Sequence, residues 1–229
     1  MIQTLRIADL KCDVAAGKPS SPALYMIYPA IVPLPESWLE DVAQQYGVSV
    51  AAVYVPADEW NNYLTPWAEP GETPQSPPFG GKAMEFKKLL ESRVIPEVEK
   101  SIGCTGAPER YLLGVSLSGL FTLWDWMQSD LFGSIACLSG SFWYEGFMDW
   151  FDSMPVPGNK GKAFFLLGVK EPKARIKAFR SVGENTLKIV GRLKESGVSV
   201  EFKWVPGDHL SGPLGRAEIG IKAAFNKNC

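Results

Sequence analysis

A serine between a short apolar run and a longer one is the residue of this sequence best placed to act as a nucleophile. Ser116 follows residues 111–115, which predict a buried strand, and precedes an apolar, aromatic-rich run long enough for a helix. Its neighbours are small: Gly114 precedes it by two positions, and Ser118 and Gly119 follow. A serine on such a strand-to-helix turn is typical of a nucleophile elbow, whose strained backbone aims the hydroxyl out of the sheet.

One position of this turn departs from the usual pattern. The elbow pattern G-x-S-x-G has glycine two residues after the serine, where this chain has Ser118, which is still small. A plainer interpretation is a Gly/Ser-rich turn in which Ser116 serves only as a helix N-cap. The strand before Ser116 and the helix after it favour the catalytic interpretation.

A serine hydroxyl is a poor nucleophile until a base takes its proton, so Ser116 needs a histidine nearby. The sequence contains one histidine, His209, which follows the last predicted strand, residues 199–205. A single histidine in a loop is more often an ordinary solvated side chain. The order Ser, acid, His along the chain, together with the position after a strand, nevertheless predicts His209 as the base.

A carboxylate is expected to fix the imidazole tautomer and to stabilise its charged form. Glu171 is our choice because it closely follows the predicted strand 163–167. Asp208 is an alternative, although neighbouring side chains in an extended loop point apart. A Ser–His pair without an acid is a further alternative.

The negative oxygen formed during ester cleavage requires two N–H donors that are already in place. The residue after the nucleophile usually supplies one donor, which predicts Leu117. The second usually comes from a loop after an earlier strand, here the turn that begins at Pro29. Because proline has no N–H, Ala30 is the predicted second donor.

Strand and helix patterns alternate along the chain, which predicts an α/β fold with a mostly parallel sheet and helices on both faces. The predicted strands are residues 4–10, 23–28, 49–55, 111–115, 133–138, 163–167 and 199–205, and the predicted helices are 36–47, 83–102 with a kink or break at Pro96, 117–127, 175–196 and 213–226. We expect one domain over residues 1–229. Ligands of such sheets bind beyond the carboxyl ends of the strands, where Ser116, Glu171 and His209 all lie.

Aromatic residues are concentrated in two segments that we place beside this edge. The proline-rich segment 56–81 predicts an ordered loop that borders a pocket, because its aromatic content argues against disorder. We predict that Trp67, Trp143 and Tyr144 line an acyl or aryl pocket, with Trp60 a further candidate. Packing in the core is the alternative for each of them.

Composition excludes several classes of function. Hydrophobic residues are 46% and charged residues 21% of the chain, and the net charge is −2, so neither nucleic acid nor an acidic membrane surface is an expected partner. No apolar run approaches the roughly 18 residues of a membrane span, and no signal peptide is visible at the N-terminus. We therefore expect a cytoplasmic protein with a small-molecule substrate, and the oligomeric state stays open.

No cofactor or metal is expected. One histidine cannot build a multi-histidine metal site, and the cysteines, Cys12, Cys104, Cys137 and Cys229, form no C-x-x-C pair and predict ordinary reduced thiols. The run 80–83 lacks two residues of a phosphate-binding loop, and no G-x-G-x-x-G follows a strand.

With these residues placed, the chain resembles the putative esterase family of α/β-hydrolases, which is related to esterase D and to enterochelin esterases. The stretches that carry the resemblance are YLTPW (63–67), FGGKAMEFKKLLESRVIPEVEK (79–100), LLGVSLSGLFTLW (112–124), LFGSIACLSGSFWY (131–144), LLGVKEPKAR (166–175) and VPGDHLSG (205–212). The resemblance implies a single-domain α/β-hydrolase fold and serine ester hydrolysis, with Ser116 as nucleophile, His209 as base and an acidic residue at Glu171.

The chain also departs from this family. Its members commonly have an arginine before the TP segment, where this sequence has Asn61 and Asn62, and Ser118 replaces the usual Gly or Ala. These differences favour a simple carboxylic ester over a siderophore triester. The leading hypothesis is a serine esterase that works through an acyl-enzyme. The alternatives are an acyltransferase with the same nucleophile and a non-catalytic hydrolase fold that binds a ligand or partner.

Overall fold

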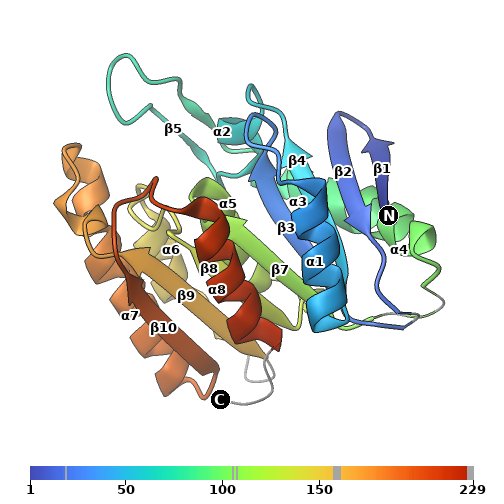
Figure 1. Ribbon diagram of the computed structural model, residues 1–229. Coiled ribbons are helices and arrows are strands. Elements are labelled where there is room, and N and C mark those ends of the chain that lie inside the picture. The colour runs from blue at the N-terminus through green and yellow to red at the C-terminus, as the bar shows by residue number, and fades with distance from the viewer. Residues whose placement is uncertain (19, 105, 107, 157–160, 226–229) are drawn as a thin grey trace.

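The computed structural model describes residues 1–18, 20–104, 106, 108–156 and 161–225 (Figure 1). Within these residues an eight-stranded sheet runs through the molecule in the order β1-β2-β4-β3-β7-β8-β9-β10. Its strands are β1 (Ile2–Ile7), β2 (Leu10–Ala15), β3 (Ala23–Pro29), β4 (Ser49–Val55), β7 (Arg110–Val115), β8 (Ser134–Leu138), β9 (Lys162–Gly168) and β10 (Ser199–Val205). The strands from β4 to β10 are parallel, whereas β1 and β2 pair antiparallel at one edge. The predicted mostly parallel sheet is therefore confirmed.

The predicted strand over residues 4–10 is confirmed only for residues 4–7, because this region forms a hairpin of two strands, β1 and β2. The chain turns between them at Ala8, whose φ is 54°. Strand β2 is mostly buried, but it contains the polar residues Lys11 and Asp13, so its sequence lacks the continuous apolar pattern of a buried strand. Asp13 is only 1% exposed, and its carboxylate accepts hydrogen bonds from Thr4 and Lys11. A buried polar residue with partners of this kind breaks the apolar run that sequence patterns rely on.

Helices cover both faces of the sheet, as predicted. One face carries α1 (Glu36–Tyr46) and α8 (Pro213–Phe225), which stand in front of the sheet in Figure 1. The other face carries α3 (Ala83–Leu89), α4 (Ile95–Ser101), α5 (Leu117–Trp126), α6 (Phe147–Ser153) and α7 (Val182–Glu195).

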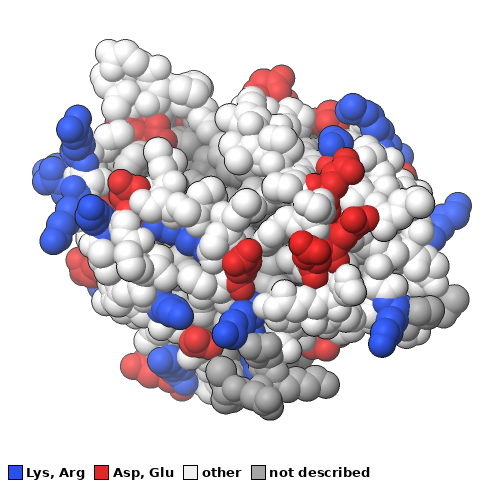
Figure 2. Space-filling model, viewed as in Figure 1, with Lys and Arg blue, Asp and Glu red and all other residues white. Residues whose placement is uncertain are grey.

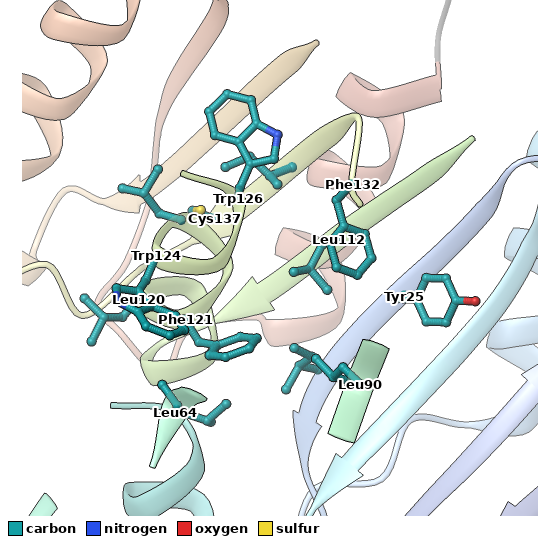
Figure 3. Packing of buried hydrophobic residues seen from close by; sticks show 14 of the residues in the cluster. Tyr25, Leu64, Leu90, Leu112, Leu120, Phe121, Trp124, Trp126, Phe132 and Cys137 are labelled. Atoms are coloured by element: carbon teal, nitrogen blue, oxygen red, sulfur yellow. The ribbon is translucent and has the colours of Figure 1, made fainter. Parts of the chain in front are cut away.

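Helix α5 lies wholly inside the larger of the two apolar clusters. Every one of its residues is buried, including the polar residues Ser118, Thr122 and Asp125, as expected for a mainly apolar helix in a core. Figure 3 shows Leu120, Phe121, Trp124 and Trp126 of this helix packed among residues of the sheet and of neighbouring helices. The helix that follows Ser116 is thus held on all sides, which fixes the position of the turn before it.

The predicted break at Pro96 is confirmed, and a wide turn accommodates it. A π-helical segment, η1 (Leu90–Val94), separates α3 from α4, and Pro96 lies in the first turn of α4. Proline has no N–H to donate to the preceding turn and its ring crowds the carbonyl there, so a local widening of the helix removes the conflict.

Other boundaries differ from the sequence pattern. A 3-10 turn, η2 (Glu171–Lys173), precedes the predicted helix over 175–196. That helix begins with a second 3-10 turn, η3 (Lys177–Ser181), and α7 starts only at Val182. Helix α6 was not predicted, and the segment 56–81 contains α2 (Trp60–Tyr63) and a small hairpin of β5 (Ala68–Glu69) and β6 (Phe79–Gly80). The last residue of the predicted closing helix, Asn226, and Cys229 lie outside the described residues. None of the helices described is both long and apolar enough to cross a membrane.

Candidate active site

The candidate site lies at the carboxyl ends of four strands that are neighbours in the sheet. Ser116 follows β7, Ser139 follows β8, Glu171 follows β9 and His209 follows β10. Since these strands are parallel, their carboxyl ends share one edge, which is where ligands of such sheets bind. The structure therefore brings together the three residues that were singled out from the sequence and adds Ser139 to them.

Ser116 occupies a strained turn between β7 and α5. Its φ of 60° and ψ of −124° are unfavourable for a residue with a side chain, and such a conformation costs about 1–3 kcal/mol. The backbone is held there by its own hydrogen bonds: the Ser116 N–H donates to the carbonyl of Leu138, and its carbonyl accepts from Leu120 and Ser141. The turn thus has the geometry of a nucleophile elbow.

The small residues around the turn are required by close approaches of the backbone. A Cβ at position 114 would lie 2.1 Å from the carbonyl oxygen of Ser118, and a Cβ at position 119 would lie 2.9 Å from Cα of Gly140. Real Cβ atoms do not approach so closely, so both positions need glycine.

Ser118 fits the elbow although the usual residue there is glycine. Its side chain is fully buried, and its hydroxyl accepts a hydrogen bond from the N–H of Val115 at 2.7 Å. The same hydroxyl has two carbonyl acceptors, those of Ile27 and Val115, each at 2.8 Å. Ser118 therefore links the strand β7 to the start of α5 instead of distorting the turn.

Ser116, His209 and Glu171 form a continuous chain of hydrogen-bonding distances. The Oγ of Ser116 lies 3.0 Å from Nε2 of His209, and Nδ1 of His209 lies 2.9 Å from Oε2 of Glu171. The imidazole is partly exposed, with 41% of its side chain accessible, whereas the side chain of Glu171 is 4% exposed. This arrangement of nucleophile, base and orienting acid is the one that activates a serine.

Hydrogen bonds keep the buried carboxylate of Glu171 ionised. Burial by itself would raise the pKa of Glu171, but hydrogen bonds from His209, Ser139 and the Gly168 N–H outweigh it and lower the pKa of this carboxyl below its ordinary value. Oε1 accepts from Ser139 Oγ at 2.7 Å and from the Gly168 N–H at 2.7 Å. A negative charge is therefore present behind His209 at neutral pH.

Asp208, the alternative acid, points elsewhere. Its Oδ1 accepts hydrogen bonds from the Ser211 hydroxyl at 2.8 Å and from the Leu210 N–H at 3.2 Å. These bonds to Ser211 and Leu210 lower the pKa of Asp208, so the carboxylate caps the turn of its own loop. Glu171, not Asp208, is the acid that contacts the imidazole.

A cavity of about 420 Å³ opens beside Ser116 and His209. The surface of its wall is mostly apolar, with contributions from Trp60, Trp143 and Phe179, although polar and charged side chains also line it. The rings of Trp143 and Phe179 pack against each other with their centroids 4.4 Å apart. The prediction that the segment 56–81 borders a pocket is confirmed, because Trp60, Asn61 and Glu72 contribute to this wall.

The predictions for Trp67 and Tyr144 as pocket residues are wrong. Neither residue lines the cavity; their rings pack against each other, and the Tyr144 hydroxyl donates to the Trp67 carbonyl at 2.6 Å. Trp67 in turn donates its indole N–H to the carbonyl of Glu145. The Tyr144 hydroxyl and the Trp67 indole N–H therefore both have hydrogen-bond acceptors within the protein, and the two rings lie outside the cavity lining.

The N–H groups of Leu117 and Ala30, the two predicted donors to an oxyanion, differ in whether they already have an acceptor. Leu117 is the first residue of α5 and lines the cavity, and an N–H in the first turn of a helix has no intrahelical acceptor. The N–H of Ala30, in contrast, donates to the carbonyl of Val55 at 2.9 Å. The prediction for Ala30 is therefore corrected, because its N–H already has an acceptor.

Two buried side chains that touch Glu171, those of Ser139 and Arg216, were not predicted from the sequence. Ser139 was visible as a polar residue after a strand, in the same position relative to β8 that Ser116 has relative to β7. Arg216, on α8, is 4% exposed, and its Nη1 donates to Oε1 of Glu171 at 2.9 Å and to Ser139 Oγ at 2.5 Å. An arginine between apolar residues on the buried face of α8 was the only available signal.

Charges of both signs are spread over the face seen in Figure 2, and several basic side chains gather at the edge where the segment before α7 lies in Figure 1. The exposed cations of that segment are Lys170, Lys173, Arg175, Lys177 and Arg180.

Among the residues that the structure describes, no group of three or more His, Cys, Asp or Glu side chains could hold a metal ion.

A family profile matches more than half of the chain. The profile of the family described as "Putative esterase" matches residues 34–165. The protein of Bacillus subtilis (strain 168) named "Uncharacterized protein YbbA" is 26% identical over 135 residues, which are 58% of this chain and 54% of that protein. The match thus spans about half the length of this relative.

Solved structures with the same fold include two hydrolases. An IroE-like serine hydrolase from Shewanella oneidensis superposes with a TM-score of 0.79 at 15% identity, over 98% of this chain and 80% of its own. The siderophore hydrolase EstA from Aspergillus nidulans superposes with a TM-score of 0.72 at 18% identity, over 100% of this chain and 95% of its own. Identities this low establish the fold alone, and the predicted α/β-hydrolase architecture is confirmed.

Proposed function

Because the chain belongs to the putative esterase family, whose profile covers residues 34–165, we propose that it is a serine hydrolase that cleaves a carboxylic ester. The observation that carries the proposal is the hydrogen-bonded chain from Ser116 through His209 to Glu171, at 3.0 and 2.9 Å, next to a largely apolar cavity. Similarity to a siderophore hydrolase supports ester chemistry.

The proposed reaction begins with Ser116. As its Oγ attacks the ester carbonyl, Nε2 of His209 takes the hydroxyl proton, and the carboxylate of Glu171 stabilises the imidazolium that forms. The same proton then passes from His209 to the departing alkoxide, which leaves an acyl group on Ser116. Water, deprotonated by His209, releases the acid and restores the serine.

The negative oxygen of the tetrahedral intermediate needs donors beside Ser116. We assign one of them to the N–H of Leu117, for the reason given above. For the second we propose Ile31, the residue after Ala30. Strand β3 is next to β7, so the turn after β3 lies at the same edge of the sheet as Ser116. Within the described residues the Ile31 N–H donates to no backbone acceptor, in contrast to the N–H groups of Ala30 and Val32.

The cavity indicates the kind of ester. Its wall of Trp60, Trp143, Phe179 and Val182 offers apolar and aromatic contact, and its volume of about 420 Å³ lies in the usual range of small-ligand pockets. We therefore propose a small or medium ester with an apolar or aryl group.

The first experiment is intact-mass labelling with a fluorophosphonate, which reacts preferentially with an activated serine. Wild type should gain one adduct, Ser116→Ala should gain none, and His209→Ala should react much more slowly. A folded wild type without an adduct would contradict the proposal and would favour a fold that only binds a ligand. Burst kinetics with and without an added alcohol or thiol then separate hydrolysis from acyl transfer.

A further inference from the structure

The guanidinium of Arg216 reaches three of the four loops that carry the candidate site. Nη1 donates to Oε1 of Glu171 after β9, at 2.9 Å, and to the hydroxyl of Ser139 after β8, at 2.5 Å. Nη2 donates to the backbone carbonyl of Asp208, the residue before His209 in the loop after β10. Arg216 itself belongs to α8, which follows that loop. One side chain thus connects the acid, its hydroxyl partner and the loop of the base.

These contacts divide the two oxygens of Glu171 between different partners. Oε1 receives three donors, from Arg216, Ser139 and the Gly168 N–H. Oε2 is left to Nδ1 of His209. A carboxylate whose first oxygen is held by three donors cannot rotate freely, so the direction of its second oxygen is fixed. This is the geometry required to hold the imidazole in one tautomer.

The surroundings of Arg216 leave room for this arrangement. A Cβ at position 168 would lie 2.7 Å from Nη2 of Arg216, 2.7 Å from the carbonyl oxygen of Gly207 and 2.9 Å from Oε1 of Glu171. Only glycine at position 168 lets the guanidinium and the carboxylate meet where they do. The end of β9 is therefore shaped around the pair of Arg216 and Glu171.

Stability alone is a weak reason to bury such a pair. Taking a guanidinium and a carboxylate out of water is unfavourable for each ion, and apolar residues of similar volume often stabilise a protein as well or better. Arg216 is 4% exposed, and its Nε has no hydrogen-bond partner among the described residues. The position of this pair, directly behind His209, indicates a role in the chemistry of the site.

We propose that Arg216 is a positioning residue: with Ser139 it holds Glu171 so that Oε2 faces His209, and it anchors the loop of His209 through the carbonyl of Asp208. This inference rests on the proposed function of Ser116, His209 and Glu171. Arg216 does not touch the reacting atoms, and its effect on them passes through Glu171 and His209.

The test compares three variants that are first shown to be folded by circular dichroism and gel filtration. Arg216→Met removes the guanidinium, and Arg216→Lys keeps a charge but has one nitrogen in place of a fork. Arg192→Met is the matched control. Arg192 is also partly buried and donates to the backbone carbonyls of Phe151 and Met154, which belong to no part of the candidate site.

Two quantities are measured on each protein, purified without a histidine tag. The first is the rate of fluorophosphonate labelling, together with kcat and KM for any ester that is turned over. The second is the nitrogen-15 spectrum of the imidazole, which needs no assignment because His209 is the one histidine of the chain. A hydrogen-bonded Nδ1–H signal reports directly on the contact with Glu171.

The expected result is a loss of positioning in Arg216→Met. Labelling should slow by about 10- to 100-fold, by analogy with groups that orient the histidine and carboxylate ligands of metal ions. We also expect a lower kcat, little change in KM and loss of the Nδ1–H signal. Arg216→Lys should recover part of the rate, and Arg192→Met should keep both the rate and the signal.

Other outcomes overturn the inference. Arg216→Met that labels at the wild-type rate, or that keeps the Nδ1–H signal, would leave Arg216 with a structural role only. If Arg216→Met does not fold, Arg216→Lys decides: one ammonium cannot serve Ser139, Glu171 and Asp208 together, so a wild-type rate would contradict positioning. If wild type itself is not labelled, the proposed function fails, while the Nδ1–H signal still tests the contact between Glu171 and His209.

Discussion

The carboxylate of Glu171 meets the imidazole of His209 through one oxygen only, with 2.9 Å between Oε2 and Nδ1. The other oxygen is occupied by donors from β9, from the loop after β8 and from α8. Glu171 therefore has a single orientation toward the base, and its removal has consequences for both the reaction and the stability of the protein.

Replacing Glu171 by glutamine should greatly reduce turnover while it preserves shape. The amide cannot hold the imidazole in the tautomer that accepts the serine proton, so kcat should fall by about 10²–10⁴-fold with KM little changed. Steady-state kinetics on an aryl ester measures this. The control is Glu184→Gln, an exposed residue on α7 paired with Lys188, which should behave as wild type. If Asp208→Asn proves as damaging as Glu171→Gln, the assignment of the acid is wrong.

The ionisation of Glu171 should also make stability depend on pH in a defined range. Burial alone would raise the pKa of Glu171 in the folded state. Hydrogen bonds from His209 and Ser139 outweigh this effect, so the pKa is lowered. A glutamate in an unfolded chain has a pKa of about 4.3, so the ionised Glu171 stabilises the folded state above that pH. The contribution is lost as the pH falls through the lower pKa of the folded state.

Urea unfolding of wild type and Glu171→Gln at several pH values checks this expectation. The difference in unfolding free energy between the two proteins should not decrease between pH 7 and about pH 5, and it should shrink below about pH 4. A difference that shrinks between pH 7 and 5 instead would mean that Glu171 does not have a lowered pKa.

The sequence predicted the site where its residues follow strands. Ser116, Glu171 and His209 could be found because a parallel sheet brings strand ends to one edge, whatever the details of packing. Arg216 could not be found in this way, since it reaches the site from the inner face of a helix, and only the packing of α8 on β8 and β9 brings it there. Ala30 was placed correctly in a turn, but the hydrogen bond of its N–H depends on how β3 and β4 end.

Some strands of the fold were predictable from the sequence and others were not. Parallel strands with continuous apolar residues, such as β4 with every residue buried, stood out clearly. Strand β2 did not, because its Asp13 and Lys11 pair with each other and with a neighbouring strand. The aromatic residues could not be assigned from the sequence either. Trp143 and Tyr144 are adjacent in the chain, yet Trp143 lines the cavity and Tyr144 packs on Trp67.

The close contact behind the elbow predicts a large difference between two glycine substitutions. Gly114→Ala would place a Cβ 2.1 Å from the carbonyl oxygen of Ser118, so the turn at Ser116 must shift, and we expect loss of labelling together with a lower melting temperature. Gly191→Ala, in the helix α7, meets nothing within 4 Å and should instead stabilise the protein by about 0.5–1 kcal/mol. Chemical denaturation of both variants measures the contrast. Equal effects of the two substitutions would show that position 114 does not restrict the elbow.

The apolar wall of the cavity predicts how specificity should change. Trp143 packs on Phe179 and lines the cavity, so Trp143→Ala should weaken the binding of esters with an aryl or long acyl group and leave small acetyl esters almost unaffected. We expect kcat/KM for the larger esters to fall by about 10-fold or more, because apolar contact with this partly buried indole should contribute on the order of 1–3 kcal/mol. Trp38→Ala is the control, since Trp38 lies on α1 and donates to Glu218 on α8. A uniform loss over all esters after Trp143→Ala would mean that this residue supports the fold and does not select the substrate.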